Sequence, residues 1–303
     1  MNIRNNFFIA IGALLLSGTA FAQPSMMNDK AQDAPANNKA VTDDWMPSLV
    51  KDGAIVGVDH IYKVEEWNPI REIDVAWKRR VWREIDIRQK QNDAFRYVGD
   101  ENTGGGSFIE ILIHAVKTGK VAAYSTVDDR FTIPLDLDAF NKMLFGSSDS
   151  SLQEDPITGE QIWVVSKNEF NINSVTKYQL KEDWIFDRNL GRLVVRIIGI
   201  APLIDRIDEN TGAFRYATPM FWLYYPDLRR VLANYEVYNP QNDVHRITWT
   251  DYLDNRYFSS YVIKTSANNP TNRRLPANDL RALQEGQEQQ MDIIHKEMDM
   301  WEN

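Results

Sequence analysis

The chain has 303 residues, with 34 Lys and Arg, 43 Asp and Glu, and no Cys. The lack of cysteine excludes disulfides, thiolate zinc sites, iron–sulfur clusters and a cysteine nucleophile. The formal net charge of −9 disfavours a general nucleic-acid partner, which would need basic surface to replace phosphate counterions. Hydrophobic residues make up 43% of the chain, enough for the core of one large or two small domains.

The N-terminus has the three parts of a secretory signal peptide. Arg4 supplies the positive charge, residues 7–16 are apolar, and Ala20-Phe21-Ala22 is a small-x-small cleavage site. We expect residues 1–22 to be removed by cleavage after Ala22. Residues 23–57 are predicted to be a flexible lead-in, because they begin with a long stretch that holds almost no large apolar side chain.

Residues 70–90 are predicted to form an amphipathic helix that begins at Asn68-Pro69. Apolar residues recur there in steps of three, four, four and four, at Ile70, Ile73, Trp77, Val81 and Ile85. Two ion pairs are expected at a spacing of four, Asp74–Lys78 and Glu84–Arg88. The opposite face would carry a row of cations, Lys78, Arg79, Arg80, Arg83 and Arg88.

The middle of the chain favours an α+β fold. Ser107 and Glu110 form a capping-box pattern for a helix over 107–118, and further helices are expected at 137–145 and 249–258. Residues 121–124 read as a short strand, 146–160 as an acidic loop, and 161–225 as β structure centred on a hairpin with its turn at 187–191. The predicted architecture is an antiparallel sheet from 161–225 that packs on one face against amphipathic helices at 70–90, 107–118 and 249–258.

The C-terminus is predicted to be a helical tail over residues 280–303, separated from a core domain at 58–264 by a linker at 265–279. Its stripe has coiled-coil-like spacing with one polar break at Gln287. The apolar members of the stripe are Leu280, Leu283, Met291, Ile294, Met298 and Trp301. Gly286 weakens such a helix by about 1 kcal/mol relative to Ala.

Patterns that would indicate catalysis are missing. The chain has no nucleophile elbow and no HExxH motif, and Glu182 and Asp183 are neighbours that point to opposite faces of a strand. We therefore expect no enzyme, no metal site and no cofactor. A hydrolase would need a carboxylate cluster in a pocket, which the sequence does not indicate. The nine Trp and twelve Tyr leave open a glycan- or peptidoglycan-binding module.

Several long strings resemble the family of the gliding motility protein GldN, called PorN in non-gliding relatives. They are residues 74–86 (DVAWKRRVWREID), 184–187 (WIFD) followed by 195–202 (VRIIGIAP), 221–226 (FWLYYP) and 258–261 (FSSY). The similarity extends from about Val58 to Lys264.

The resemblance implies a periplasmic component of the type IX secretion system of Bacteroidota. It implies a ring formed with the outer-membrane lipoprotein GldK/PorK at the inner face of the outer membrane, and contact with the periplasmic part of the GldM/PorM motor shaft. The family brings no catalytic residues. The cations of residues 70–90 and the 280–301 stripe are our candidate interfaces; the alternatives are a solvated charged face and a frayed tail.

Overall fold

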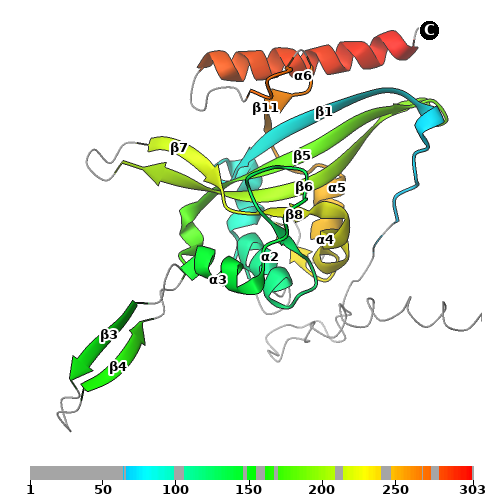
Figure 1. Ribbon diagram of the computed structural model, residues 1–303. Coiled ribbons are helices and arrows are strands. Elements are labelled where there is room, and N and C mark those ends of the chain that lie inside the picture. Colours follow the sequence, from blue (N-terminus) through cyan, green and yellow to red (C-terminus); the bar gives the residue numbers. More distant parts are fainter. Residues whose placement is uncertain are drawn as a thin grey trace, which may run out of the picture. The chain divides into compact units, whose positions relative to one another are not determined.

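The structure is a computed structural model (Figure 1). It describes residues 64, 66–98, 106–145, 149–154, 161–166, 170–208, 214–239, 247–267, 269–273 and 280–301, with the backbone alone at 149–154 and 161–166. These residues all belong to one compact unit, Val41–Asn303. The expected signal peptide at 1–22 and lead-in at 23–57 lie outside the described residues.

A seven-stranded antiparallel sheet forms the body of this unit, in the order β11-β1-β5-β6-β8-β2, with β7 also paired to β6. Its strands are β1 Val75–Asp86, β2 Ala123–Tyr124, β5 Val175–Asp187, β6 Arg192–Ile207, β7 Phe214–Pro219, β8 Trp222–Tyr224 and β11 Tyr261–Thr265. Two further strand pairs are β3 Asp149–Glu154 with β4 Gln161–Ser166, and β9 Glu236–Val237 with β10 Ile247–Thr248.

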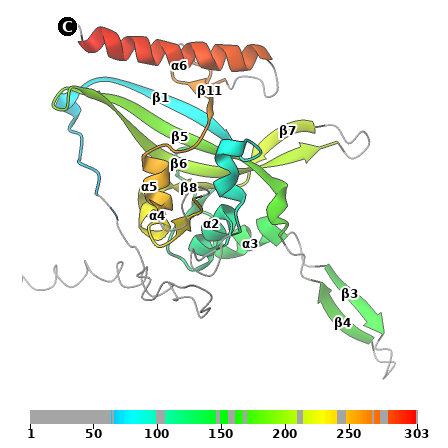
Figure 2. The same cartoon turned by 180° about the vertical axis from the view of Figure 1, so that it is seen from behind.

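Helices lie around this sheet (Figures 1 and 2). The α-helices are α2 Phe108–Lys117, α3 Leu137–Phe145, α4 Tyr225–Leu232, α5 Trp249–Asp254 and α6 Leu280–Trp301. Short 3-10 turns are η1 Glu72–Asp74, η2 Lys90–Arg96 and η3 Ile172–Ser174. The predicted α+β class with an antiparallel sheet and a C-terminal helix is confirmed.

The helix predicted over residues 70–90 is wrong, because residues 75–86 form strand β1. Steps of four are even, so Trp77, Val81 and Ile85 share one face of a strand as well as one face of a helix. Asp74 and Arg88 flank this strand, and other ion pairs replace the two that were expected of a helix, with Asp74 bound by Arg71. Lys78 instead pairs with Asp183, and Arg88 pairs with Asp86.

The predicted hairpin is present as β5 and β6, joined by the turn at 188–191. Leu180 lies opposite Ile200, and Trp184 lies opposite Val195. One extra residue on β6 shifts this register between Lys181 and Glu182, which is a β-bulge. Because β6 has neighbours on both sides, its apolar character on both faces fits the interior of the sheet.

The capping signals of two helices are also confirmed. The backbone N–H of Ser107 donates to the Glu110 carboxylate at 2.7 Å, and α2 ends at Lys117, two residues before Gly119, whose φ is +70°. The Thr248 hydroxyl accepts from the backbone N–H of Asp251 at 3.2 Å. The helix there ends at Asp254, four residues earlier than expected, and Arg256 follows with a φ of +57°.

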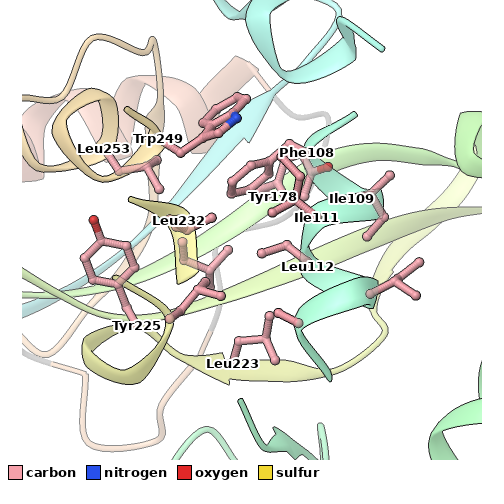
Figure 3. Close-up of a cluster of buried hydrophobic side chains, with 14 of the residues drawn as sticks. Phe108, Ile109, Ile111, Leu112, Tyr178, Leu223, Tyr225, Leu232, Trp249 and Leu253 are labelled. Carbon is pink, nitrogen blue, oxygen red and sulfur yellow. The ribbon is translucent and has the colours of Figure 1, made fainter. Parts of the chain in front are cut away.

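Helices α2, α4 and α5 bury the main core against β5 and β6 (Figure 3). Phe108 is fully buried, and its ring lies 4.4 Å from Trp249 and 5.1 Å from Tyr178. Edge-on and tilted aromatic pairs of this kind add to the stabilisation that burial provides. Leu112 and Leu223 complete the same cluster from α2 and β8.

Two other sequence predictions need correction. The loop expected at 146–160 contains strand β3, where Leu152 lies opposite Trp163 of β4. The β structure expected up to residue 225 is interrupted at 220–221 and ends at Tyr224, because Tyr225 begins helix α4 with Pro226 in its first turn. Proline fits a helix start because the N–H that it lacks would have no partner within the helix there.

Residues 125–134 cover part of the second face of the sheet. Phe131 has a φ of +59° and packs against Tyr124, Trp222 and Tyr224. A Cβ atom at Gly199 would come closer than 3.0 Å to the Phe131 ring, so this contact requires glycine. Asp129 accepts from Trp82 Nε1 at 2.7 Å and, through its main-chain carbonyl, from Lys181 Nζ.

Candidate interaction surfaces

Helix α6 contacts its own sheet through small side chains. Ala282 and Gly286 are buried, and Gly286 lies directly against the backbone carbonyl of Val262 in β11. A Cβ atom at Gly286 would approach that oxygen closer than 3.0 Å. The glycine that the sequence marks as a weak point of the helix is therefore what lets α6 approach the edge strand (Figure 1).

One large side chain of α6 enters a small core of its own. Ile293 is fully buried and packs with Val81, Trp184 and Val262, from β1, β5 and β11. Beyond it, the Glu297 carboxylate accepts from the backbone N–H of Leu193 at 3.4 Å. The inner face of α6 thus holds little apolar surface for a helix of 22 residues.

The predicted stripe lies on another face of α6, and its apolar side chains are exposed. The exposed fraction ranges from 36% for Ile294 to 70% for Leu280. The set of exposed apolar residues is Leu280, Leu283, Met291, Ile294, Met298 and Trp301. The spacing therefore identified an apolar face correctly, but the described sheet packs against the neighbouring face, not against this one.

Arg83 is one of the predicted interface cations, and the structure buries it between β1 and α6. Its guanidinium donates to the hydroxyl and carbonyl of Ser260, each at 2.8 Å, and to Gln290 of α6 at 3.2 Å. Burial lowers its pKa to about 10. Arg83 therefore links α6 to the sheet, and its expected place on an exposed helical face is wrong.

A buried carboxylate lies near Arg83. Glu182 is fully buried and pairs with Arg256 at 2.6 Å, and it accepts a hydrogen bond from Trp184 Nε1 at 2.9 Å. Arg256 also lies over the Trp184 ring, 5.5 Å from its centroid. This pair joins Arg256, the second residue after α5, to the centre of the sheet, between the main core and the contact with α6.

The other predicted cations are distributed over both faces of β1. Lys78 and Arg80 both pair with Asp183, at 2.8 and 2.7 Å, and keep 45% and 37% of their side chains exposed. Burial alone would raise the pKa of Asp183, but hydrogen bonds from these cations hold it below its ordinary value. Arg79 lies over the Trp77 ring at 5.1 Å, and Arg88 is bound by Asp86.

Aromatic residues in the described ranges mostly belong to the interior. Trp82, Trp184, Trp222 and Trp249 are at most 9% exposed, whereas Trp301 of α6 is 68% exposed. The described residues contain no group of three His, Asp or Glu side chains placed to hold a metal ion. None of the helices in these ranges combines the length and hydropathy that a transmembrane span needs.

The sequence prediction missed the contacts that attach α6 to the sheet. Ala282 and Gly286, four residues apart, indicate a face that allows close approach, and this was the available signal. Gln290 and Ser260, which fix Arg83, carry no such signal. Their role depends on β1 being a strand, which the sequence prediction had wrong.

A family model described as gliding motility associated protein GldN matches residues 70–302, a range that includes β1 and all of α6. No curated protein matches the chain.

Proposed function

This chain belongs to the family of gliding motility associated proteins GldN, and we propose that it is a non-enzymatic structural subunit of the type IX secretion and gliding machinery. In this proposal the chain acts in the periplasm after cleavage behind Ala22. It forms a ring with the outer-membrane lipoprotein GldK/PorK under the outer membrane, and it contacts the GldM/PorM shaft.

The observation that carries the proposal is the exposed stripe of α6. A protein that acts by assembly needs apolar surface that its own fold leaves uncovered, and six large apolar side chains of α6 are at least 36% exposed. The helix that carries them is fixed to the sheet by Ile293 and Gly286, so the stripe is presented on a rigid support.

The rival function, a glycan- or peptidoglycan-binding module, has less support. Such a module would present several aromatic rings on one surface, and four of the described Trp side chains are instead buried. Tryptophan fluorescence with soluble cell-wall fragments separates the two functions. A saturable change would favour the rival, and a flat response would count against it.

A deletion strain tests the proposed function directly. We expect removal of the gene to abolish export of type IX cargo, and the full-length gene supplied in trans to restore it. Export at the wild-type level in the deletion strain would contradict the proposal. An unrelated periplasmic protein serves as the control for general secretion.

A further inference from the structure

The two apolar faces of α6 differ in a way that points to a partner. The face against the sheet buries Ala282, Gly286 and Ile293, while the larger Leu, Met and Trp side chains lie outside. A helix that only covered its own sheet would turn its larger apolar side chains inward. The exposed stripe also continues for the whole length of α6, about 32 Å at 1.5 Å per residue.

The polar residues beside the stripe show what charge the partner should carry. The described residues that follow the stripe by one position form a row, Arg281, Gln284, Glu288, Asp292, His295 and Asp299. This acidic row holds three carboxylates and a single Lys or Arg, Arg281, which lies in the first turn of α6. Over the whole of α6, five acidic residues stand against two basic ones, so the surface that meets this helix should be basic.

A second copy of α6 does not supply that charge. In an antiparallel pair of stripes, the acidic row of one helix would face the same row of the other. In a parallel pair, it would face the opposite flank, which carries Gln290 and Glu297. Each copy of α6 carries five acidic residues against two basic ones, so a second α6 suits this surface less well than a basic partner does.

We propose that the exposed stripe of α6 docks into an apolar groove on a different protein, and that Lys and Arg side chains form the rim of this groove. The stripe supplies anchors at helical spacing, as in other helix-in-groove complexes, and the acidic row fixes the orientation of the helix. The inference rests on the proposed function, because the partner would be another component of the same assembly.

Site-specific photo-crosslinking in the native host tests this inference on the full chain. A photoreactive amino acid replaces Ile294 in the stripe, and in a matched strain it replaces Glu285, which lies away from the stripe. We expect the Ile294 position to crosslink to a different protein, at an apolar segment with Lys or Arg beside it, and the Glu285 position to give little product. Mass spectrometry of the crosslinked peptide identifies the segment.

Two substitutions in the crosslinking chain make the test quantitative. Met298→Asp, at an exposed position, should lower the crosslink yield about tenfold or more, as loss of an interface anchor does. Glu288→Lys should lower it about threefold or more, whereas Glu285→Lys, about 60° further round the helix, should leave it unchanged. Thermal denaturation of each variant checks that the fold is intact.

Several outcomes would overturn the inference. These are a crosslink to a second copy of the chain, a crosslink only within the same chain, an acidic rim on the captured segment, or no specific product. Cargo export separates this failure from failure of the proposed function. If export depends on the gene but not on the stripe, the proposed function stands and the inference about the stripe fails. If the stripe crosslinks to a groove with a basic rim but the deletion strain exports cargo normally, the docking inference stands and the proposed function fails.

Discussion

At the scale of single residues, Glu182 and Arg256 form the ion pair whose loss should lower the free energy of unfolding most. Glu182 is fully buried, so Arg256→Met leaves an unpaired charge in the interior. We expect this variant to lower the free energy of unfolding by about 3–5 kcal/mol. Urea denaturation of the variant and of the wild-type chain measures the effect.

Arg71→Met is the matched control for this substitution. Arg71 pairs with Asp74 at 2.7 Å, but 71% of its side chain is exposed. Exposed ion pairs stabilise a fold little, so the control should leave the free energy of unfolding almost unchanged. Equal effects of the two substitutions would contradict the role assigned to Glu182.

Asp183 should make the fold sensitive to acid. Its pKa lies below the ordinary value when it is bound by Arg80 and Lys78. A carboxyl of this kind stabilises the fold above its unfolded pKa, and the stabilisation is lost as pH falls through the folded pKa. We expect the thermal midpoint to fall as the pH is lowered from about 5 to about 2, and we expect Asp183→Asn to reduce the slope of the midpoint against pH. Equal slopes of the thermal midpoint against pH for the wild-type chain and Asp183→Asn would rule out this role of Asp183.

At the scale of single elements, β1 shows why the sequence prediction failed where it did. Apolar steps of four satisfy a helix and a strand equally, and the signs that favoured a helix were the start signal Asn68-Pro69 and the step of three from Ile70 to Ile73. The β-branched and aromatic content of the segment, Val75, Trp77, Val81 and Trp82 among them, favours a strand. Pairing with β5 and β11 then decided the outcome.

Elements with local signals were predicted more reliably. Helix α2 has its capping box and Gly119, and the hairpin of β5 and β6 has its turn, so both could be read from neighbouring residues. Strand β3 depends on its pairing with β4, and the start of helix α4 is signalled by a single proline. The α6 stripe was visible as a pattern, but which face meets the sheet depends on the contact of Gly286 with β11.

Replacement of Gly286 by alanine should therefore destabilise the fold, although alanine has the higher helix propensity. In an isolated helix, Gly→Ala stabilises by about 1 kcal/mol. In the folded chain, the new Cβ would press on the Val262 carbonyl, so we expect Gly286→Ala to lower the thermal midpoint and to increase hydrogen exchange in α6. Gln287→Ala, at an exposed position, serves as the control. A raised midpoint for Gly286→Ala would refute this contact.

For the whole molecule, α6 has two roles: it covers part of the sheet, and it presents the exposed stripe. Different variants separate these two roles. The triple variant Met291→Gln, Ile294→Gln and Met298→Gln changes exposed side chains, so we expect the thermal midpoint to stay within a few degrees of wild type. Deletion of residues 280–303 should lower the midpoint clearly, because it also uncovers Val81, Trp184 and Val262. Differential scanning calorimetry of the two variants checks this difference, and equal midpoints would contradict it.

On the scale of the whole molecule, the proposed role is that of an exported subunit that assembles through α6. Its most direct test is light scattering after size-exclusion chromatography of the chain co-expressed with the lipoprotein of the same secretion locus. We expect a co-eluting complex that grows into very large species, and smaller species with the triple stripe variant at an unchanged thermal midpoint. A lone monomer of the wild-type chain at every salt concentration would contradict it.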